Sequence, residues 1–541
     1  MRDFHLPGRS PAYGRDGMAA TSHALATLTA IDVLQAGGNA VDAAIAASAV
    51  LCVVEPQSTG IGGDCFVLYA PADAPEGSPE GAEKVVALNG SGKAPGAANL
   101  SWYIDQGMKQ ISLQSPHAVT VPGAVDAWEK LHNDYGRKPW AELFTPAIRL
   151  AIEGYTVHPR VAHDWAQLAK KLKATENAAR MLLVNGVAPK AGDHHHQPEL
   201  GHTLQIIAQQ GREGFYTGPV AEDMVSYLQS IGGLHTLEDF AAPQADYVTP
   251  ISTAYRGYEV VECPPNGQGL TALIMLNILS GFDLTDLAPM SAQRLHLECE
   301  AARLAYGVRD RYIADPDQAD IPLDFLLSQD YAAQLRAKIS LDKAMPLLSD
   351  SDFPTHPDTV YLCVVDSEGN AVSFINSLFH GFGSGLVSPK TGVTLQNRGA
   401  GFVLEAGHRN AIAPYKRPLH TIIPGMLMKK EANKTRAVMP FGVMGGQYQP
   451  TGHAHFLTNL LDYRMNVQAA LDFPRVFHDG KACEVERGVP SQVRESLVSM
   501  GHKVVPAVLP HGGGQAIWMG EKGDLVGGSD ARKDGCALGY E

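Results

Sequence analysis

Residues 358–377 read DTVYLCVVDSEGNAVSFINS and form the most informative stretch of this 541-residue chain. Two apolar, β-branched runs flank the DSEGN cluster at 366–370, whose residue types are typical of a turn. The pattern predicts a β-hairpin, with Thr359 at the mouth of its first strand.

A threonine in this position becomes a strong nucleophile if the chain is cut directly before it. Its hydroxyl is a weak nucleophile until a base takes the proton, and a cut between Asp358 and Thr359 would create such a base, the α-amine of Thr359 itself. An α-amine has a pKa of about 7.7–8.0, close to the pH at which a general base is most useful. If such a cut occurs, the uncut chain lacks this amine and would be an inactive precursor. From the residue alone an ordinary strand threonine is the commoner case, so the interpretation depends on motifs elsewhere.

The composition describes a globular protein. Hydrophobic residues make up 45% of the chain and charged residues 18%, and the net charge of −14 opposes binding to nucleic acid or to an anionic membrane. No stretch reaches about 20 uncharged apolar residues. Residues 1–9 lack the basic start and apolar run of a secretory signal. We expect no nucleic-acid or membrane partner and a cytoplasmic location.

Cysteine and histidine patterns give no sign of a disulfide framework or a metal motif. The seven cysteines are scattered, show no CxxC spacing and predict reduced core residues. The run His194-His195-His196 invites a metal interpretation, but consecutive side chains point in different directions and no HExxH spacing accompanies them. A solvated loop is the favoured interpretation, and no metal or other cofactor is predicted.

Two helices are predicted with opposite character. Residues 40–54, with Asn39 as the N-cap, are apolar almost all round, which predicts a helix buried on every side. Residues 292–313 predict an amphipathic helix with a solvated charged face. That face would carry Arg294, Glu298, Glu300, Arg303, Arg309 and Arg311.

The hairpin resembles one found in the γ-glutamyltransferase family of N-terminal nucleophile (Ntn) hydrolases. In that family a proenzyme cuts itself before a threonine that opens a Thr-x-(few apolar)-Val-Val-Asp-x-x-Gly-Asn-Ala-Val hairpin. Counting back seven residues from Asp366 identifies Thr359 as the nucleophile and Asp358-Thr359 as the cleaved bond. Thr355 is an alternative, because Thr-His follows the cut in some members. Prolines flank that Thr-His pair, however, and a proline cannot donate a hydrogen bond to a sheet ladder.

Other motifs of the family follow in order along the chain. They include GGNAVDAA at 37–44, a glycine turn at 60–64, PHAVTVPGAVDAW at 116–128 and GSDARKDG at 528–535. The role of GGNAVDAA in the family is packing, so we assign it no chemistry, and the turn at 60–64 resembles a backbone feature of the family. The resemblance covers residues 17–540. It implies a four-layer αββα Ntn-hydrolase sandwich made of a large subunit, 1–358, and a small catalytic subunit, 359–541, with a dimer of heterodimers as one assembly that the cleaved chain could form.

The resemblance also implies the catalytic residues. Ser377 lies 18 residues after Thr359, where the family has a hydroxyl residue that hydrogen-bonds the nucleophile. Gly445 and Gly446 match a glycine pair whose backbone N–H groups form the oxyanion hole, because glycines let two main-chain donors approach a developing negative charge.

Three anchors for a glutamyl substrate are replaced in this chain. Where the family has an arginine for the α-carboxylate, an asparagine, and an aspartate for the α-ammonium group, this sequence has Ser91, Phe379 and Gly401. A glutamyl group would leave its charged ends unpaired, which is costly in a pocket. We therefore expect weak γ-glutamyl activity or none.

Other positions point to a different acyl group. Arg398 replaces a glutamine of the family and could hold a carboxylate, although an arginine beside a turn is more often solvated or structural. His420 and Thr421 occupy the positions of two serines, and Thr421 keeps a hydroxyl donor. The predicted function is a self-processing Ntn amidohydrolase that cleaves a small amide through a Thr359 acyl-enzyme. Glutathione hydrolysis and γ-glutamyl transfer are the family activities, with oxamate or a glutaryl-type amide as alternative substrates.

Two other functional classes fit parts of the sequence. HGGG at 511–514 resembles the oxyanion loop of lipases, but the nearest candidate elbow, GGSDA at 527–531, lacks its last glycine and leaves too little chain for the remaining triad members. A catalytically inactive family member that acts as a binding protein is the second alternative, which a permanently uncut chain would favour.

Overall fold

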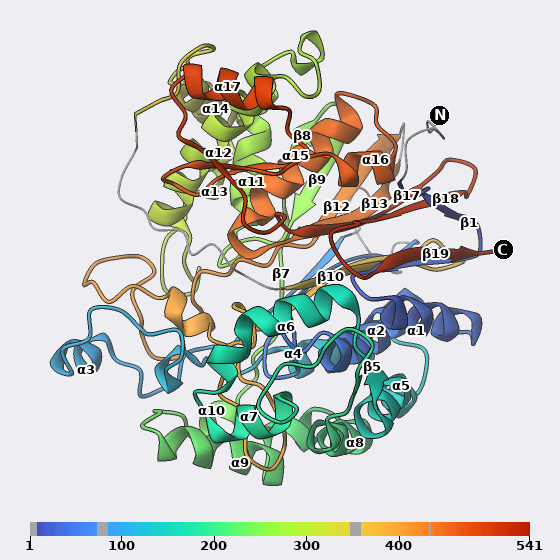
Figure 1. The fold of residues 1–541 in the computed structure, drawn as a ribbon, viewed down its shortest axis with the longest axis vertical. Helices are drawn as coiled ribbons and strands as arrows, with labels where there is room; N and C mark the ends of the chain where they lie inside the picture. The colour runs from blue at the N-terminus through green and yellow to red at the C-terminus, as the bar shows by residue number, and fades with distance from the viewer. Residues whose placement is uncertain (1–7, 73–84, 347–358, 432–433) are drawn as a thin grey trace.

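The computed structural model describes residues 8–72, 85–346, 359–431 and 434–541, and its centre is a pair of stacked antiparallel sheets (Figure 1). The first sheet has the order β1 (Ala12–Gly14), β18 (Leu525–Ser529), β17 (Gly513–Met519), β13 (Lys434–Met444), β12 (Gly425–Glu431), β9 (Tyr258–Glu262), β8 (Ile251–Tyr255). The second has the order β19 (Cys536–Tyr540), β2 (Gly17–Thr21), β10 (Val360–Val365), β11 (Ala371–Ser377), β3 (Asp64–Ala70), β4 (Val86–Gly90), β7 (Asp246–Val248).

Apolar side chains from the two sheets form the central core. Phe66, Tyr361 and Ile375 from the second sheet pack in one cluster with Met426 and Ile517 from the first. Alternating side chains of each strand face this layer, while the other face of each sheet is left to the helices.

Helices cover both outer faces (Figure 1). On the second sheet lie α1 (Ala24–Gln35), α2 (Ala40–Val54) and α4 (Ala124–Tyr135), with α5 (Trp140–Glu153) and α8 (Pro198–Tyr216) packed outside them. On the first lie α11 (Gly269–Leu279), α15 (Gln449–Leu461) and α16 (Val467–Asp472), with α12 (Ala292–Tyr312) packed against α11 and α15. The predicted four-layer αββα sandwich is confirmed. Because both large sheets are antiparallel, the fold is also not that of an α/β-hydrolase, and residues 511–514 lead into β17.

The hairpin at the centre forms as predicted. Strands β10 and β11 pair from Val360 opposite Asn376 to Val365 opposite Ala371. Asp366 organises the turn, because its carboxylate accepts hydrogen bonds from the N–H groups of Glu368 and Asn370. The same carboxylate accepts the Ala40 N–H at 3.0 Å and so ties the turn to the start of α2.

Helix α2 also matches its prediction. Every residue from Ala40 to Val54 is buried. Asn39 caps the helix by accepting the Asp42 N–H, and the Asp42 side chain accepts the Asn39 N–H in return. The apolar sequence is therefore the consequence of a helix enclosed on all sides.

The predicted solvated face of residues 292–313 is wrong. Only Arg311 of the six charged residues is exposed, and Arg294 and Glu300 are fully buried. Glu298 pairs with Arg294 at 2.9 Å and with His455 of α15 at 2.8 Å. Burial alone would raise the pKa of Glu298, but these two partners lower it to about 2. The charges are accommodated because they pair with one another and with α15 instead of with water.

Smaller corrections concern the histidine run. His194 and His195 form the short strand β6, which pairs with β5 (Tyr155–Thr156), so the run is not a loop. His194 and His196 are exposed, whereas His195 is buried against the Trp165 ring. All seven cysteines are free thiols, and six of them are buried, as predicted. No helix in the described part of the chain is both long enough and apolar enough to cross a bilayer.

Candidate active site

Thr359 and Ser377 come together at the open end of the hairpin. Thr359 directly precedes β10, is 1% exposed, and its Oγ1 lies 3.1 Å from Ser377 Oγ at the end of β11. Ser377 Oγ also accepts the N–H of Phe379 at 2.9 Å. Asn376, the neighbouring residue, points the opposite way and donates to Thr59 Oγ1. The strand alternation therefore aims the hydroxyl of Ser377, and not the amide of Asn376, at the predicted nucleophile.

Gly445 and Gly446 form the turn between β13 and the short helix η4 (Gly446–Tyr448). Their φ angles are +129° and +50°, in the region that favours glycine, and a Cβ on Gly445 would lie 2.9 Å from the backbone of Gly512. The Gln268 amide donates to the carbonyl oxygens of Gly446 and Thr421. These two hydrogen bonds connect the glycine turn to the segment that carries Thr421. These φ angles account for the glycines at this turn, and their role in an oxyanion hole stays a prediction.

Asp64 has a larger role than the backbone turn that the sequence suggested. Its Oδ1 accepts the N–H groups of Gly92 and Gly123 and the amide of Gln396, and its Oδ2 lies 2.9 Å from His420 Nε2. His420 Nδ1 accepts the Ile422 N–H, so the Nε2 proton is the one donated to Asp64. Burial, followed by the charge of Arg398, lowers the pKa of His420 to about 4. His420 is therefore neutral near pH 7 and fixed in one tautomer.

Arg398, at the start of η3 (Arg398–Gly401), is fully buried and not solvated. Its Nη1 donates to Thr421 Oγ1 at 2.7 Å and its Nη2 to Ser377 Oγ at 3.4 Å. Its guanidinium lies 4.1 Å from the centre of the Phe379 ring. Among the described residues no carboxylate pairs with it and its Nε has no hydrogen-bond partner. Burial lowers its pKa to about 9. The Ser377 hydroxyl lies between this cation and Thr359. The hydrogen-bond partners of Arg398 in the described chain are neutral, and the carboxylate charge that acts on it is that of Asp64, without a direct ion pair.

The three replaced glutamyl anchors lie in different surroundings. Phe379 has a φ of +80° and supplies the ring under Arg398. Ser91 is buried, and its hydroxyl accepts the amide of Asn266 at 3.0 Å. Gly401 ends η3, and its carbonyl accepts the Asn410 amide. Of the three, Phe379 is the one in direct contact with the Arg398 side chain, and a substrate role for each of them stays a prediction.

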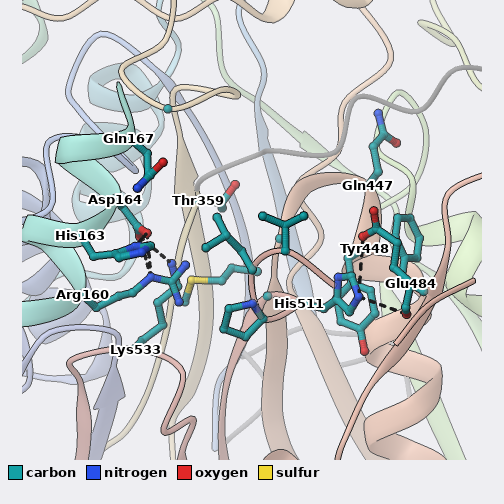
Figure 2. Close-up of a pocket in the computed structure, with 18 of the residues that line it drawn as sticks. Arg160, His163, Asp164, Gln167, Thr359, Gln447, Tyr448, Glu484, His511 and Lys533 are labelled. Carbon is teal, nitrogen blue, oxygen red and sulfur yellow. Dashed lines mark hydrogen bonds and ion pairs between the residues drawn. The ribbon is translucent and has the colours of Figure 1, made fainter. Parts of the chain in front are cut away.

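A cavity of about 450 Å³ opens beside Thr359 and Gly445 (Figure 2). Helix α6 (Pro159–Leu172) and the C-terminal tail form one wall, and the other comes from the region after β13, from the strand residue Glu484 and from the segment around His511. The labelled lining residues are Arg160, His163, Asp164, Gln167 and Lys533 on the first wall and Gln447, Tyr448, Glu484 and His511 on the second.

Sequence reasoning assigned no site role to these walls. Arg160 Nε and Lys533 Nζ lie 2.8 and 3.8 Å from the Asp164 carboxylate, so two cations share one anion. Lys533 belongs to the motif at 528–535, which the sequence analysis matched to the family without giving its lysine a role. That match was a signal from which a site role for Lys533 could have been predicted. The residues of α6 offered no comparable pattern.

Acidification should destabilise the protein through His420. Because its folded pKa of about 4 lies below the ordinary 6.5, the unfolded chain binds the extra proton between these values, and stability falls as pH drops from about 6.5 to about 4. Buried His23, His195, His235 and His511 have lowered pKa values and act in the same direction. A His420→Gln variant can still donate a hydrogen bond to Asp64. Its free energy of unfolding, measured by chemical unfolding, should depend less steeply on pH in this range, by up to about 1.4 kcal/mol per pH unit. Parallel wild-type and variant curves would contradict this assignment.

Comparison with known proteins shows the family of this chain. A family model described as Gamma-glutamyltranspeptidase matches residues 26–540. The chain belongs to the γ-glutamyltranspeptidase family. It is 37% identical over 536 residues to the glutathione hydrolase-like YwrD proenzyme of Bacillus subtilis, covering 97% of this chain and 99% of that one. It is 34% identical over 541 residues to the oxamate amidohydrolase proenzyme of Klebsiella pneumoniae, covering 97% and 98%.

A solved structure extends the agreement to three dimensions. The crystal structure of cephalosporin acylase from Bacillus halodurans matches with a TM-score of 0.90 and 39% identity, over 100% of this chain and 99% of that one. Family membership confirms the predicted resemblance and makes the chain an Ntn-type hydrolase rather than a member of an unrelated hydrolase class.

Proposed function

We propose that this protein is a self-processing amidohydrolase that cuts its own chain before Thr359 and then uses Thr359 as an acyl-accepting nucleophile. The support is the contact of Thr359 with Ser377, its place on the cavity, and the glycine turn on the same cavity. Asp358 and the alternative Thr355 lie outside the described residues. The proposed large and small subunits are residues 1–358 and 359–541.

The residues present suit a two-step acyl transfer. The new α-amine takes the proton of Thr359 Oγ1, which attacks the amide carbon, and the oxyanion receives hydrogen bonds from the N–H groups of Gly445 and Gly446. Each such donor is worth about 3–4 kcal/mol in hydrolases. The amine then gives its proton to the leaving nitrogen, and water hydrolyses the ester. Ser377 Oγ accepts N–H groups of Phe379 and Arg398 and lies 3.1 Å from Thr359 Oγ1, within hydrogen-bonding distance of the nucleophile.

The burial of Arg398 without an anion is the observation that carries the substrate assignment. A buried cation without a direct ion pair is unfavourable, and the charge of Asp64 offsets only part of the effect of burial on Arg398. A substrate carboxylate would supply the directly paired anion in a bidentate pair. The Ser377 hydroxyl lies between Thr359 Oγ1, at 3.1 Å, and Arg398 Nη2, at 3.4 Å. The distance between Oγ1 and Nη2 therefore cannot exceed the sum of these two distances. The acyl carboxylate must therefore lie within a few bonds of the scissile carbonyl.

This geometry favours the monoamide of a short dicarboxylic acid, with oxamate as the shortest case and glutaryl amides as the long limit. The oxamate amidohydrolase of Klebsiella pneumoniae and the cephalosporin acylase of Bacillus halodurans are relatives whose names fit amide substrates. No cofactor enters this chemistry. The dimer of heterodimers and the cytoplasmic location stay predictions.

A substrate panel tests the proposal. Mature enzyme is given oxamate, succinamate and glutaramate, the neutral methyl ester of each as a size-matched control, and γ-glutamyl anilide. For oxamate and succinamate, we expect kcat/KM for ammonia release to be at least tenfold higher than for the corresponding methyl ester. We expect γ-glutamyl anilide to have a low kcat/KM. If the γ-glutamyl compound is clearly best, the substrate assignment is wrong.

A further inference from the structure

A buried group of histidine and cysteine side chains lies between α12 and a small third sheet. That sheet consists of β14 (Val476–His478), β15 (Cys483–Val485) and β16 (Val504–Pro506), and α17 (Ser491–Ser499) packs on α12 beside it (Figure 1). The group comprises Cys299, His478, Cys483 and His502, each no more than 5% exposed. None of the four appears in the described lining of the Thr359 cavity, so the group is separate from the active site.

Three donor atoms are close enough to one another to share a metal ion, and the fourth, Cys299 Sγ, contacts one of the three, Cys483 Sγ. The potential ligand atoms of His478, Cys483 and His502 all lie within 4.8 Å of one another. His502 Nδ1 is 3.4 Å from Cys483 Sγ, and Cys299 Sγ is 3.6 Å from Cys483 Sγ. With Zn–S bonds of about 2.3 Å and Zn–N bonds of about 2.0–2.1 Å, tetrahedral ligand atoms lie roughly 3.5–3.8 Å apart. Two pairs in the group therefore need almost no movement to share one ion.

A chain of hydrogen bonds fixes the tautomer of His502 in the state that a metal needs. His296 Nε2 lies 2.8 Å from the carbonyl oxygen of Ser340, which can only accept, so the His296 proton is on Nε2. His296 Nδ1 must then accept from His502 Nε2, 2.7 Å away. The proton of neutral His502 is thus on Nε2, and the lone pair of its Nδ1 points toward Cys483. Ligating histidines in metal sites are oriented by this kind of outer hydrogen bond.

His478 is the ligand that must rearrange most. Its Nδ1 accepts the N–H of Gly480 at 3.1 Å, which leaves the proton on Nε2. Binding a metal through Nε2 would move that proton to Nδ1 and end the Gly480 contact. We therefore expect a smaller loss of metal on removal of His478 than on removal of either cysteine.

We propose that Cys299, Cys483, His502 and His478 form a structural zinc site. Two thiolates and two imidazoles are the donor set of closed structural zinc sites, and soft sulfur ligands favour zinc over calcium or magnesium. On zinc binding, each thiol releases its proton and each sulfur forms a bond to the ion, so no oxidant or reductant is needed.

The position of the site suggests what the ion would do, and this part rests on the proposed cut before Thr359. Cys299 belongs to the proposed large subunit and the other three ligands to the small one, so the ion would join the two chains. The same region of α12 holds the last described residues before the cut, because Glu300 accepts the Met345 N–H and Arg303 donates to the Met345 carbonyl. Zinc would fasten this end of the large subunit after cleavage.

Metal analysis tests the site independently of activity. Wild-type protein is loaded with zinc, dialysed and analysed by mass spectrometry of the element, and we expect one zinc per chain. Cys483→Ala and Cys299→Ala should each lower this value at least fivefold. A His194→Ala/His196→Ala double variant, which removes exposed histidines that could hold zinc by chance, should keep it. The uncut Thr359→Ala variant should also bind one zinc, which separates failure of this site from failure of the proposed cleavage.

Cobalt substitution gives a second readout. It uses wild-type protein, so its result does not depend on whether the cysteine variants fold. Cobalt-loaded wild-type protein should show thiolate-to-cobalt charge-transfer absorption, and added zinc should remove it. Absence of both stoichiometric zinc and this absorption would overturn the proposal. It would also be overturned if the reduced protein carried no zinc and readily formed a Cys299–Cys483 disulfide, detected as a cross-linked peptide, since the pair would then be a redox element.

Discussion

A Thr359→Ala variant is expected to remain one uncut chain and to lose amide hydrolysis by a factor on the order of 10⁶, the scale seen when a hydrolase loses its nucleophile. The reason is that a single atom, Oγ1, serves both reactions: it attacks the preceding carbonyl during processing and the substrate carbonyl during turnover. A denaturing gel with N-terminal sequencing and an ammonia-release assay measure the two effects. Wild-type protein should give fragments 1–358 and 359–541, the second beginning Thr-Val-Tyr-Leu.

Two control variants make this result specific. Thr359→Ser keeps a hydroxyl and should still process, more slowly. Thr355 is the alternative nucleophile. Because it plays no part in the proposed reaction, Thr355→Ala should be cleaved like the wild type. A fragment that begins at Thr355, or a Thr355→Ala chain that stays intact, would move the cleavage site and refute the assignment of Thr359.

The parts of this fold that could be predicted are those encoded by neighbouring residues. The hairpin at 360–377 follows from two β-branched runs around a turn, and α2 follows from an apolar run after the Asn39 cap. In both cases the residues that determine the structure lie in one continuous stretch of the chain. Thr359 and Ser377 are 18 residues apart and lie at the open end of this hairpin. The assignment of Ser377 as the partner of the nucleophile came from the family resemblance.

Features built from distant segments could not be predicted in this way. The charges of α12 looked solvated because their partners, such as His455 and Asn459 of α15, are far away in the sequence. Asp64 looked like part of a turn because its partner His420 belongs to the other half of the chain. One wall of the cavity joins α6 to Lys533 near the C-terminus. A charged residue has the same local pattern whether water or a remote partner satisfies it, so the sequence cannot distinguish the two cases.

The second large effect is expected from Arg398→Gln, which restores the residue type found in the family at this position. Loss of the charged pair should lower kcat/KM for oxamate and succinamate by about 10- to 100-fold, since a hydrogen bond to a charged group is worth about 1.5–3 kcal/mol. The neutral methyl esters should lose less, so the ratio of acid to ester is the diagnostic quantity. The variant should also unfold at the same temperature as the wild type or a higher one, because it removes a buried cation that has no anionic partner among the described residues.

Arg160→Gln is the matched control for that ratio. Arg160 is a second arginine near Thr359, but it lies on the cavity wall and pairs with Asp164 at 2.8 Å. If Arg398 binds the substrate carboxylate, the ratio of kcat/KM for the acid to kcat/KM for the ester should be nearly the same in Arg160→Gln as in the wild type. If the ratio collapses in Arg160→Gln and persists in Arg398→Gln, the carboxylate binds at the cavity wall. Arg398 would then act on Ser377 and Thr421 alone, and the limit on acyl length derived from its distance to Thr359 would no longer apply.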